Sequence, residues 1–185
     1  MARARAARFR NQTTAYRPSR TEKVESIDPG EVEELFLRHL APGAVTTLRS
    51  ADYLNWRFLA APYRSELAFY LTRVRGALSQ CAVVRYLPAE PRQGRILDVI
   101  GDHADEEGLT DLIRTILHDA MRQEVERVGV LGSSPGLRSS LECAGFTPHY
   151  LKRFRWRSTD GAVHDRLSSV QLHWSLADSD ADRPQ

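Results

Sequence analysis

The residues best suited to chemistry surround one acidic turn, between a short apolar run and a helix. His103 lies on this turn and titrates close to neutral pH, so it can exchange protons under physiological conditions. A lone histidine on a turn is nevertheless more often solvent-exposed than catalytic, so both interpretations stay open. The turn also carries four carboxylates, at Asp102, Asp105, Glu106 and Glu107. Their negative charge would repel an anionic ligand there.

A second group of candidates has the residue types that hold a small molecule. Trp56 and Arg57 follow Tyr53 in a predicted helix and could bind an acceptor by stacking and by charge. The alternative for Trp56 is a place in the core, because aromatic residues at helical spacing usually pack inside. A basic strand face further on, suited either to half-burial or to phosphate binding, comprises Arg153, Arg155 and Arg157.

The elements that position the acidic turn follow from apolar spacing. The run Ile96–Ile100 predicts a buried strand, and apolar residues three and four apart from Leu109 to Met121 predict an amphipathic helix. Arg127–Leu131 predicts a second buried strand. Ser133-Ser134-Pro135 then caps a short helix, Gly136–Cys143, which a glycine ends.

The remaining elements flank this segment on both sides. The sequence predicts a strand at Lys23–Ile27, a helix from the Asp28 cap to Leu40, a helix at Tyr53–Leu59, strands at Leu67–Val74 and Leu78–Leu87 around the turn Arg75-Gly76-Ala77, and final strands at Tyr150–Arg157 and Val170–Leu176. The predicted order is β-α-α-β-β-β-α-β-α-β-β. This order predicts an α/β fold.

Composition predicts one domain with two tails. The chain has 185 residues, 42% apolar and 27% charged, which suits a single core at residues 24–176. Residues 1–23 hold seven basic side chains and one acidic, which predicts a flexible basic arm, and residues 177–185 predict an acidic disordered tail. Nucleic acid is a weaker interpretation of the arm, because aromatic and basic residues do not interleave further.

Several classes of protein are disfavoured by what the sequence lacks. It contains no apolar run long enough for a membrane span and no signal-peptide core, which predicts a cytoplasmic protein. Cys81 and Cys143 lie far apart and are expected to be buried free thiols. No spacing of cysteine and histidine suggests a metal site.

The order of elements, with Gly145-Phe146 closing the last predicted helix, resembles the GCN5-related N-acetyltransferase (GNAT) superfamily over residues 24–176. The segment Asp52–Phe58, with Pro62-Tyr63 after it, resembles a GNAT-like subgroup associated with polysaccharide and cell-envelope biosynthesis. The resemblance implies a mixed sheet with helices on both faces, which splays between its fourth and fifth strands, with acyl-CoA in the gap. It also implies that the helix with Tyr53, Trp56 and Arg57 covers the acceptor side.

The resemblance implies a cofactor site, although the acidic turn differs from the superfamily's pattern. The acyl-pantetheine arm would lie along Asp98, Val99 and Ile100, opposite Ser133 and Ser134. The pyrophosphate would lie at the helix start, which comprises Gly108, Leu109 and Thr110. Only Gly108 fits the superfamily's pyrophosphate motif in the register Asp105–Thr110. Carboxylates would compete with phosphates for the helix N–H groups, at about 1 kcal/mol per like-charge contact. Arg138 or the basic arm could compensate.

The catalytic residues implied by the resemblance are also incomplete. The tyrosine that commonly protonates the leaving thiolate is replaced by Leu141, and Tyr150 is the nearest substitute. Asp98 and His103 are the candidates for a general base. The leading hypothesis is an acyl-CoA-dependent N- or O-acyltransferase that acts on a small amine or sugar acceptor by direct transfer. The alternative is a catalytically inactive GNAT-like binding module. Edge strands often pair in this fold, which would make a homodimer.

Overall fold

A computed structural model of the protein describes residues 20–42, 44, 46–88, 92–131, 134–147 and Ser175. These residues form a five-stranded sheet with the spatial order β1-β2-β3-β4-β5. The strands are β1 (Thr21–Val24), β2 (Leu67–Val74), β3 (Ala77–Leu87), β4 (Gln93–Gly101) and β5 (Arg127–Val130). All neighbours are antiparallel except β4 and β5, which are parallel. The sheet is therefore mixed, as predicted.

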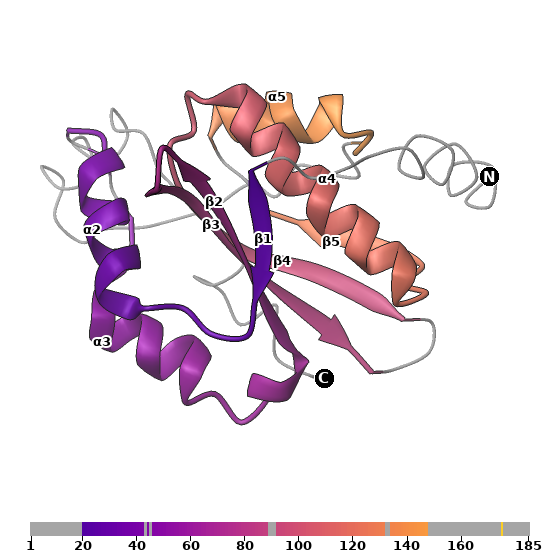
Figure 1. The fold of residues 1–185 in the computed structure, drawn as a ribbon. Helices are drawn as coiled ribbons and strands as arrows, with labels where there is room; N and C mark the ends of the chain where they lie inside the picture. The colour runs from indigo at the N-terminus through magenta and orange to yellow at the C-terminus, as the bar shows by residue number, and fades with distance from the viewer. Residues whose placement is uncertain are drawn as a thin grey trace, which may run out of the picture.

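Helices cover both faces of the sheet (Figure 1). On one face lie α2 (Pro29–His39) and α3 (Ala51–Leu54), which continues as the π-helix η1 (Asn55–Leu59); the 3-10 helix η2 (Arg64–Glu66) follows. On the other face lie α4 (Glu106–Arg122) and α5 (Pro135–Cys143). Each layer buries its own apolar cluster, centred on Leu35, Phe58 and Leu97 on the α2 side and on Ile96, Leu112 and Ile116 on the α4 side.

The first nine predicted elements occur in the predicted order, with changed boundaries. β1 spans Thr21–Val24 instead of Lys23–Ile27, because its four residues pair with β2 from Thr72 to Phe69. β4 begins at Gln93, three residues before the apolar run, because pairing with β3 and β5 extends it. Ala77 belongs to β3, so the hairpin turn consists of Arg75 and Gly76 alone.

Other predictions concern the chain ends, the cysteines and membrane spans. The strands predicted at 150–157 and 170–176 lie outside the described residues, apart from Ser175. Cys81 is a buried free thiol, as predicted, whereas Cys143 is free but exposed, because α5 turns Leu137 and Leu141 towards the core instead. Among the described residues, no helix is both long enough and apolar enough to cross a membrane.

Candidate active site

β4 continues past the end of β5, which leaves an opening beside the last part of β4 in the described chain. β4 and β5 pair only from Gln93 with Arg127 to Ile96 with Val130, although β4 continues to Gly101. Where β5 ends, the pairing with β3 skips Leu97, which makes a β-bulge. Bulges bend the strand and re-aim its side chains and peptide groups. The last five residues of β4 therefore have, within the described chain, no strand beside them on the β5 side.

The backbone of Val99 faces this opening. The Asp102 N–H donates to the Ser79 carbonyl, and hydrogen-bonded and non-hydrogen-bonded positions alternate along an antiparallel ladder. Gly101 and Val99 therefore turn their N–H and C=O groups away from β3. Side chains already satisfy those of Val99. Its N–H donates to Asp98 Oδ1 at 3.1 Å, and its carbonyl oxygen lies 3.1 Å from His103 Nε2.

Asp98, predicted as a general base, is held in a buried ion pair. Arg49 Nε lies 2.8 Å from Asp98 Oδ2, and each side chain is only 1% exposed. Arg49 also donates to the Thr47 carbonyl at 2.6 Å and to Ser175 Oγ at 3.0 Å, and its guanidinium lies 5.6 Å from the centre of the Tyr53 ring. Because both Asp98 oxygens accept hydrogen bonds, this geometry suits a positioning role better than proton abstraction.

Arg49 is the main residue of the site that the sequence did not single out. It precedes Ser50, whose side chain accepts the Tyr53 N–H at the start of α3. Nothing local distinguishes it from the other arginines. Its partner Asp98 is 49 positions away, so a rule based on sequence spacing would have missed the pair.

His103 is partly buried between two elements instead of projecting fully into solvent. Its Nδ1 lies 2.7 Å from Ser134 Oγ, and its Nε2 lies 3.1 Å from the Val99 carbonyl oxygen. A carbonyl oxygen can only accept, so Nε2 carries a proton, and in the neutral ring Nδ1 accepts from the serine hydroxyl. Ser134 Oγ in turn accepts the Leu137 N–H at 3.2 Å, as the N-cap of α5.

The acidic turn caps α4 with its own carboxylate. Asp105 Oδ1 accepts the Gly108 N–H at 2.9 Å, so one N–H that an anion would use is already occupied. A Cβ at Gly108 would lie only 2.4 Å from Asp105 Oδ2, so this capping carboxylate is sufficient reason for the glycine. The buried Gln80 braces the turn, because its Nε2 donates to the carbonyls of Asp102 and Asp105 at 3.0 and 3.3 Å.

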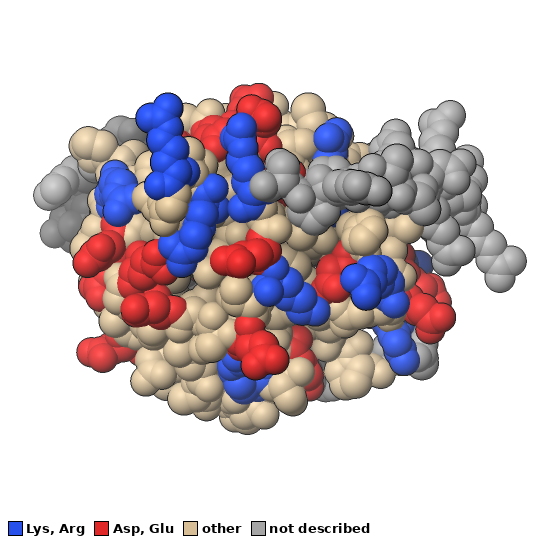
Figure 2. All heavy atoms as spheres, in the orientation of Figure 1, with Lys and Arg blue, Asp and Glu red and all other residues tan. Residues whose placement is uncertain are grey.

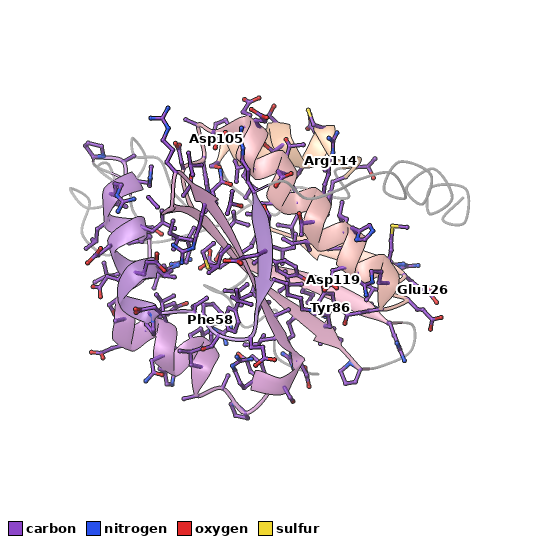
Figure 3. All side chains as sticks on the ribbon, viewed as in Figure 1. Phe58, Tyr86, Asp105, Arg114, Asp119 and Glu126 are labelled. Atoms are coloured by element: carbon purple, nitrogen blue, oxygen red, sulfur yellow. The ribbon has the colours of Figure 1, made fainter. Side chains whose placement is uncertain are left out.

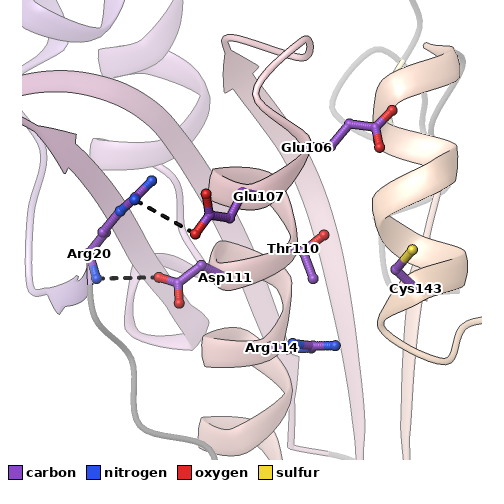
Figure 4. Close-up of a pocket in the computed structure, with 7 residues that line it drawn as sticks. All are labelled: Arg20, Glu106, Glu107, Thr110, Asp111, Arg114 and Cys143. Carbon is purple, nitrogen blue, oxygen red and sulfur yellow. Dashed lines mark hydrogen bonds and ion pairs between the residues drawn. The ribbon is translucent and has the colours of Figure 1, made fainter.

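A pocket of about 410 Å³ lies beside this turn, between α4 and α5 (Figure 4). It is lined by Arg20, Glu106, Glu107, Thr110, Asp111, Arg114 and Cys143. Three carboxylates and two guanidiniums give it mixed charge. Basic and acidic side chains are likewise interspersed over the face shown in Figure 2. The side chains that line the pocket, and not a broad region of like charge, therefore determine which ligands it attracts.

The other residues predicted to bind the cofactor fall into different environments. Ile100 belongs to the core on the α2 side and Leu109 to the core on the α4 side. Thr110 lines the pocket, whereas Arg138 is exposed on α5 and is not among the lining residues. Ser133 and the catalytic candidate Tyr150 lie outside the described residues, as do Arg153, Arg155 and Arg157.

The predicted acceptor residues lie on the opposite face, along α3 and η1. Trp56 is 67% exposed, which excludes its alternative place in the core. Leu54 and Phe58, four residues apart, form the buried stripe instead. Tyr53 is partly buried against that core, with its ring centre 6.0 Å from that of Trp56. Arg57 donates to the Tyr63 hydroxyl. The indole is therefore available to a ligand, and the arginine is held beside it.

A separate polar cluster anchors the far end of α4 to the sheet. Asp119 Oδ2 accepts hydrogen bonds from Lys23 at 2.8 Å, from Gln123 at 2.8 Å and from the Tyr70 hydroxyl, which also lies 2.8 Å from the Tyr86 hydroxyl. Figure 3 shows Asp119 beside Tyr86, near the opposite end of α4 from Asp105. Burial raises the pKa of the Asp119 carboxyl, but the bonds from Lys23, Tyr70 and Gln123 outweigh it and lower the pKa below its ordinary value.

Replacing Asp119 with asparagine is expected to destabilise the fold by about 2 kcal/mol at pH 7, since charged hydrogen bonds are lost. A carboxylate whose pKa is lower in the folded state than in the unfolded state stabilises the fold at pH values above its unfolded-state pKa. This contribution disappears as the pH falls through the folded-state pKa. The difference from the wild type should therefore shrink below about pH 4. Urea unfolding across pH measures it. The exposed Glu126→Gln is the control, and an equal loss there, or a pH-independent difference for Asp119→Asn, would contradict the assignment.

Comparisons with known proteins agree with this architecture. No protein-family profile matches the chain, and no curated protein does. Solved structures do match. The ribosomal-protein-alanine N-acetyltransferase of Brucella melitensis has a TM-score of 0.54 at 15% identity, over 75% of this chain and 100% of its own. A predicted acetyltransferase of Clostridium acetobutylicum, solved with acetyl-CoA, has a TM-score of 0.54 at 14% identity, over 72% and 94%.

A third match has a different acceptor in its name. The glucosamine-6-phosphate N-acetyltransferase of Arabidopsis thaliana has a TM-score of 0.51 at 13% identity, over 76% of this chain and 100% of its own. The alignments with this chain cover 94–100% of the length of each of these proteins. Identities this low concern the fold alone. The chain has the fold of the GCN5-related N-acetyltransferase superfamily.

Proposed function

We propose that this protein is an acyltransferase that uses acetyl-CoA or another acyl-CoA and transfers the acyl group directly to a small amine or sugar acceptor. The observation that carries the proposal is the opening beside β4, which continues past the bulge at Leu97 after β5 ends at Val130. A strand edge that turns peptide groups into such an opening can pair with the amides of an extended ligand. Pantetheine is a ligand of this kind.

The residues on both sides of the opening fit a pantetheine arm. Val99 and Gly101 would supply peptide groups from β4, and Ser134 begins the opposite wall. An acyl-CoA bound there supplies an activated thioester. The Val99 N–H, now bonded to Asp98, is turned away from β3 and would donate to the carbonyl oxygen of the thioester. Asp98, fixed by Arg49, would position that peptide group.

The acceptor would approach from the α3 side of the sheet. There the exposed Trp56 offers a stacking surface and Arg57 a positive charge. The names of two matched structures include amine acceptors, an alanine of a ribosomal protein in one and glucosamine 6-phosphate in the other. These residues and the segment Asp52–Phe58 support an amine or a sugar, and within that class we propose an acceptor used in polysaccharide biosynthesis.

The phosphate end fits less well than the pantetheine end. Asp105 occupies the Gly108 N–H, and Glu106 and Glu107 add negative charge to the first turn of α4. This observation favours a second candidate function, a GNAT-like binding module that does not use CoA. The two candidates differ in a single measurable property, the affinity for acetyl-CoA.

Isothermal titration of acetyl-CoA into the purified protein is expected to give a dissociation constant in the micromolar range, about −8 kcal/mol. Glu106→Gln with Glu107→Gln should bind about tenfold tighter at low salt, because two like charges near the phosphates are removed. The gain should shrink as salt screens the charges.

The matched control is Glu124→Gln with Glu126→Gln, which changes the net charge equally just beyond the other end of α4. It should leave the affinity unchanged. Absence of binding by the wild type and by the neutralised turn, at low and moderate salt, would favour the binding module instead.

A further inference from the structure

In the part of the chain that the structure describes, the His103 side chain bridges the opening between β4 and α5. The His103 imidazole contacts the Val99 carbonyl on one wall and Ser134 on the other, at 3.1 and 2.7 Å. The Val99 carbonyl faces away from β3, where an amide-bearing ligand would pair with it. The imidazole therefore holds the peptide group that the proposed ligand needs, and it crosses the path that the ligand would follow.

The contact between the acidic turn and α5 continues along α4 and α5. We call it the seam, and it comprises His103, Glu106, Ser134, Gly136, Ser139 and Ser140. Ser139 Oγ lies 3.3 Å from a carboxylate oxygen of Glu106, and Ser140 Oγ lies 3.3 Å from the Glu106 carbonyl. Figure 4 shows the Glu106 side chain directed towards α5. These bonds are long and partly exposed, so each is weak.

Gly136 sets how closely the two sides of the seam approach. A Cβ there would lie 1.9 Å from the His103 carbonyl oxygen, a backbone atom. Any side chain at this position must push the turn and α5 apart. The closed seam thus depends on one glycine and a few polar contacts, whereas the apolar contacts of α5, through Leu137 and Leu141, belong to the core behind it.

We propose that His103 is a latch that closes the acyl-CoA slot of this protein in its unliganded state and must swing out when the ligand binds. The inference rests on the proposed function, because it concerns access to the same site. The latch also explains why the N–H and C=O groups of Val99 are both hydrogen-bonded although they lie on an open edge of β4. A binding-competent state that is only partly populated weakens the apparent affinity by its population. Removing the latch should therefore strengthen binding.

The test compares acetyl-CoA affinity by isothermal titration in the wild type, His103→Ala and Gly136→Ala. Loss of two hydrogen bonds that close the slot is expected to tighten binding on the order of tenfold in His103→Ala. Gly136→Ala should tighten binding too, because the added methyl group pushes the two sides of the seam apart while the His103 imidazole is retained. The control is His118→Ala, a histidine further along α4, which should bind as the wild type does.

A second readout needs no ligand. Hydrogen exchange of the α5 amides should be about fivefold faster in His103→Ala than in the wild type, since the seam opens more often. If Gly136→Ala does not fold, His103→Ala and the exchange measurement still decide. Equal affinity in the wild type and His103→Ala overturns the latch and leaves the proposed function standing, and weaker binding in His103→Ala overturns it as well. No binding by any variant, with faster exchange, would overturn both the function and the latch.

Discussion

Replacing Arg49 with methionine is expected to destabilise the fold by about 3–5 kcal/mol, because it leaves the Asp98 carboxylate buried without its counter-charge. The side chains of Arg49 and Asp98 are each 1% exposed, so water cannot replace the guanidinium. Arg49 also joins the loop before α3, through Thr47, to β4 and to Ser175. Chemical denaturation at pH 7 measures the loss.

Two further variants separate the buried charge from a general effect of losing an arginine. Arg122→Met removes an exposed arginine at the end of α4 and should cost no more than about 0.5 kcal/mol. Arg49→Met combined with Asp98→Leu should be more stable than Arg49→Met alone, because an apolar pair carries no unpaired charge. A double variant less stable than the single one would refute the ion-pair account. The double variant should nevertheless have little acyltransferase activity, since the Val99 N–H loses its partner.

Replacing Phe58 with alanine is expected to cost about 3–5 kcal/mol, the usual range for a fully buried phenylalanine. Phe58 is completely buried in the core on the α2 side and packs edge-on against Tyr53, with ring centres 6.4 Å apart. It belongs to the π-helix η1, in which the Ala60 N–H donates to the Asn55 carbonyl at 2.8 Å. The cavity would therefore loosen the segment that carries the proposed acceptor residues.

Trp56→Ala is the matched control, because it removes a larger aromatic residue from the same π-helix. Its indole is 67% exposed, so its effect on stability should stay within about 0.5 kcal/mol. Its expected effect is on the acceptor instead, as a higher KM with little change in kcat. Thermal unfolding and acceptor kinetics distinguish the two variants. Equal destabilisation by both would show that the orientation of η1 differs from the one described here.

Much of the fold could be predicted because its signals are local. The apolar stripe from Leu109 to Ala120 became the buried face of α4, with Met121 only partly buried, and the predicted caps at Asp28 and Ser134 accept N–H groups of their own helices. These interactions span at most a few residues, so their spacing is visible in the sequence. The difference between the acidic turn and the superfamily's pyrophosphate motif was visible for the same reason.

The candidate site was less predictable because its contacts join distant parts of the chain. His103 and Ser134 were both candidates, but their contact spans 31 positions. Trp56 was open to two interpretations, since helical spacing alone does not say which side of a short helix meets the sheet. Trp56 flanks the buried stripe formed by Leu54 and Phe58, and only packing against β2, β3 and β4 decides this.

The sequence by itself determined the order of the strands and helices that the structure describes and the negative charge at the start of α4, and the resemblance it carries implied the mixed sheet. Periodicity, capping and composition act over short distances and need no knowledge of the final packing. Tertiary structure alone decided that Arg49 neutralises Asp98, that β4 continues as a strand after β5 ends at Val130, and that His103 bridges the gap. Each of these depends on which groups meet once the layers pack, because burial makes an unpaired charge or peptide group costly.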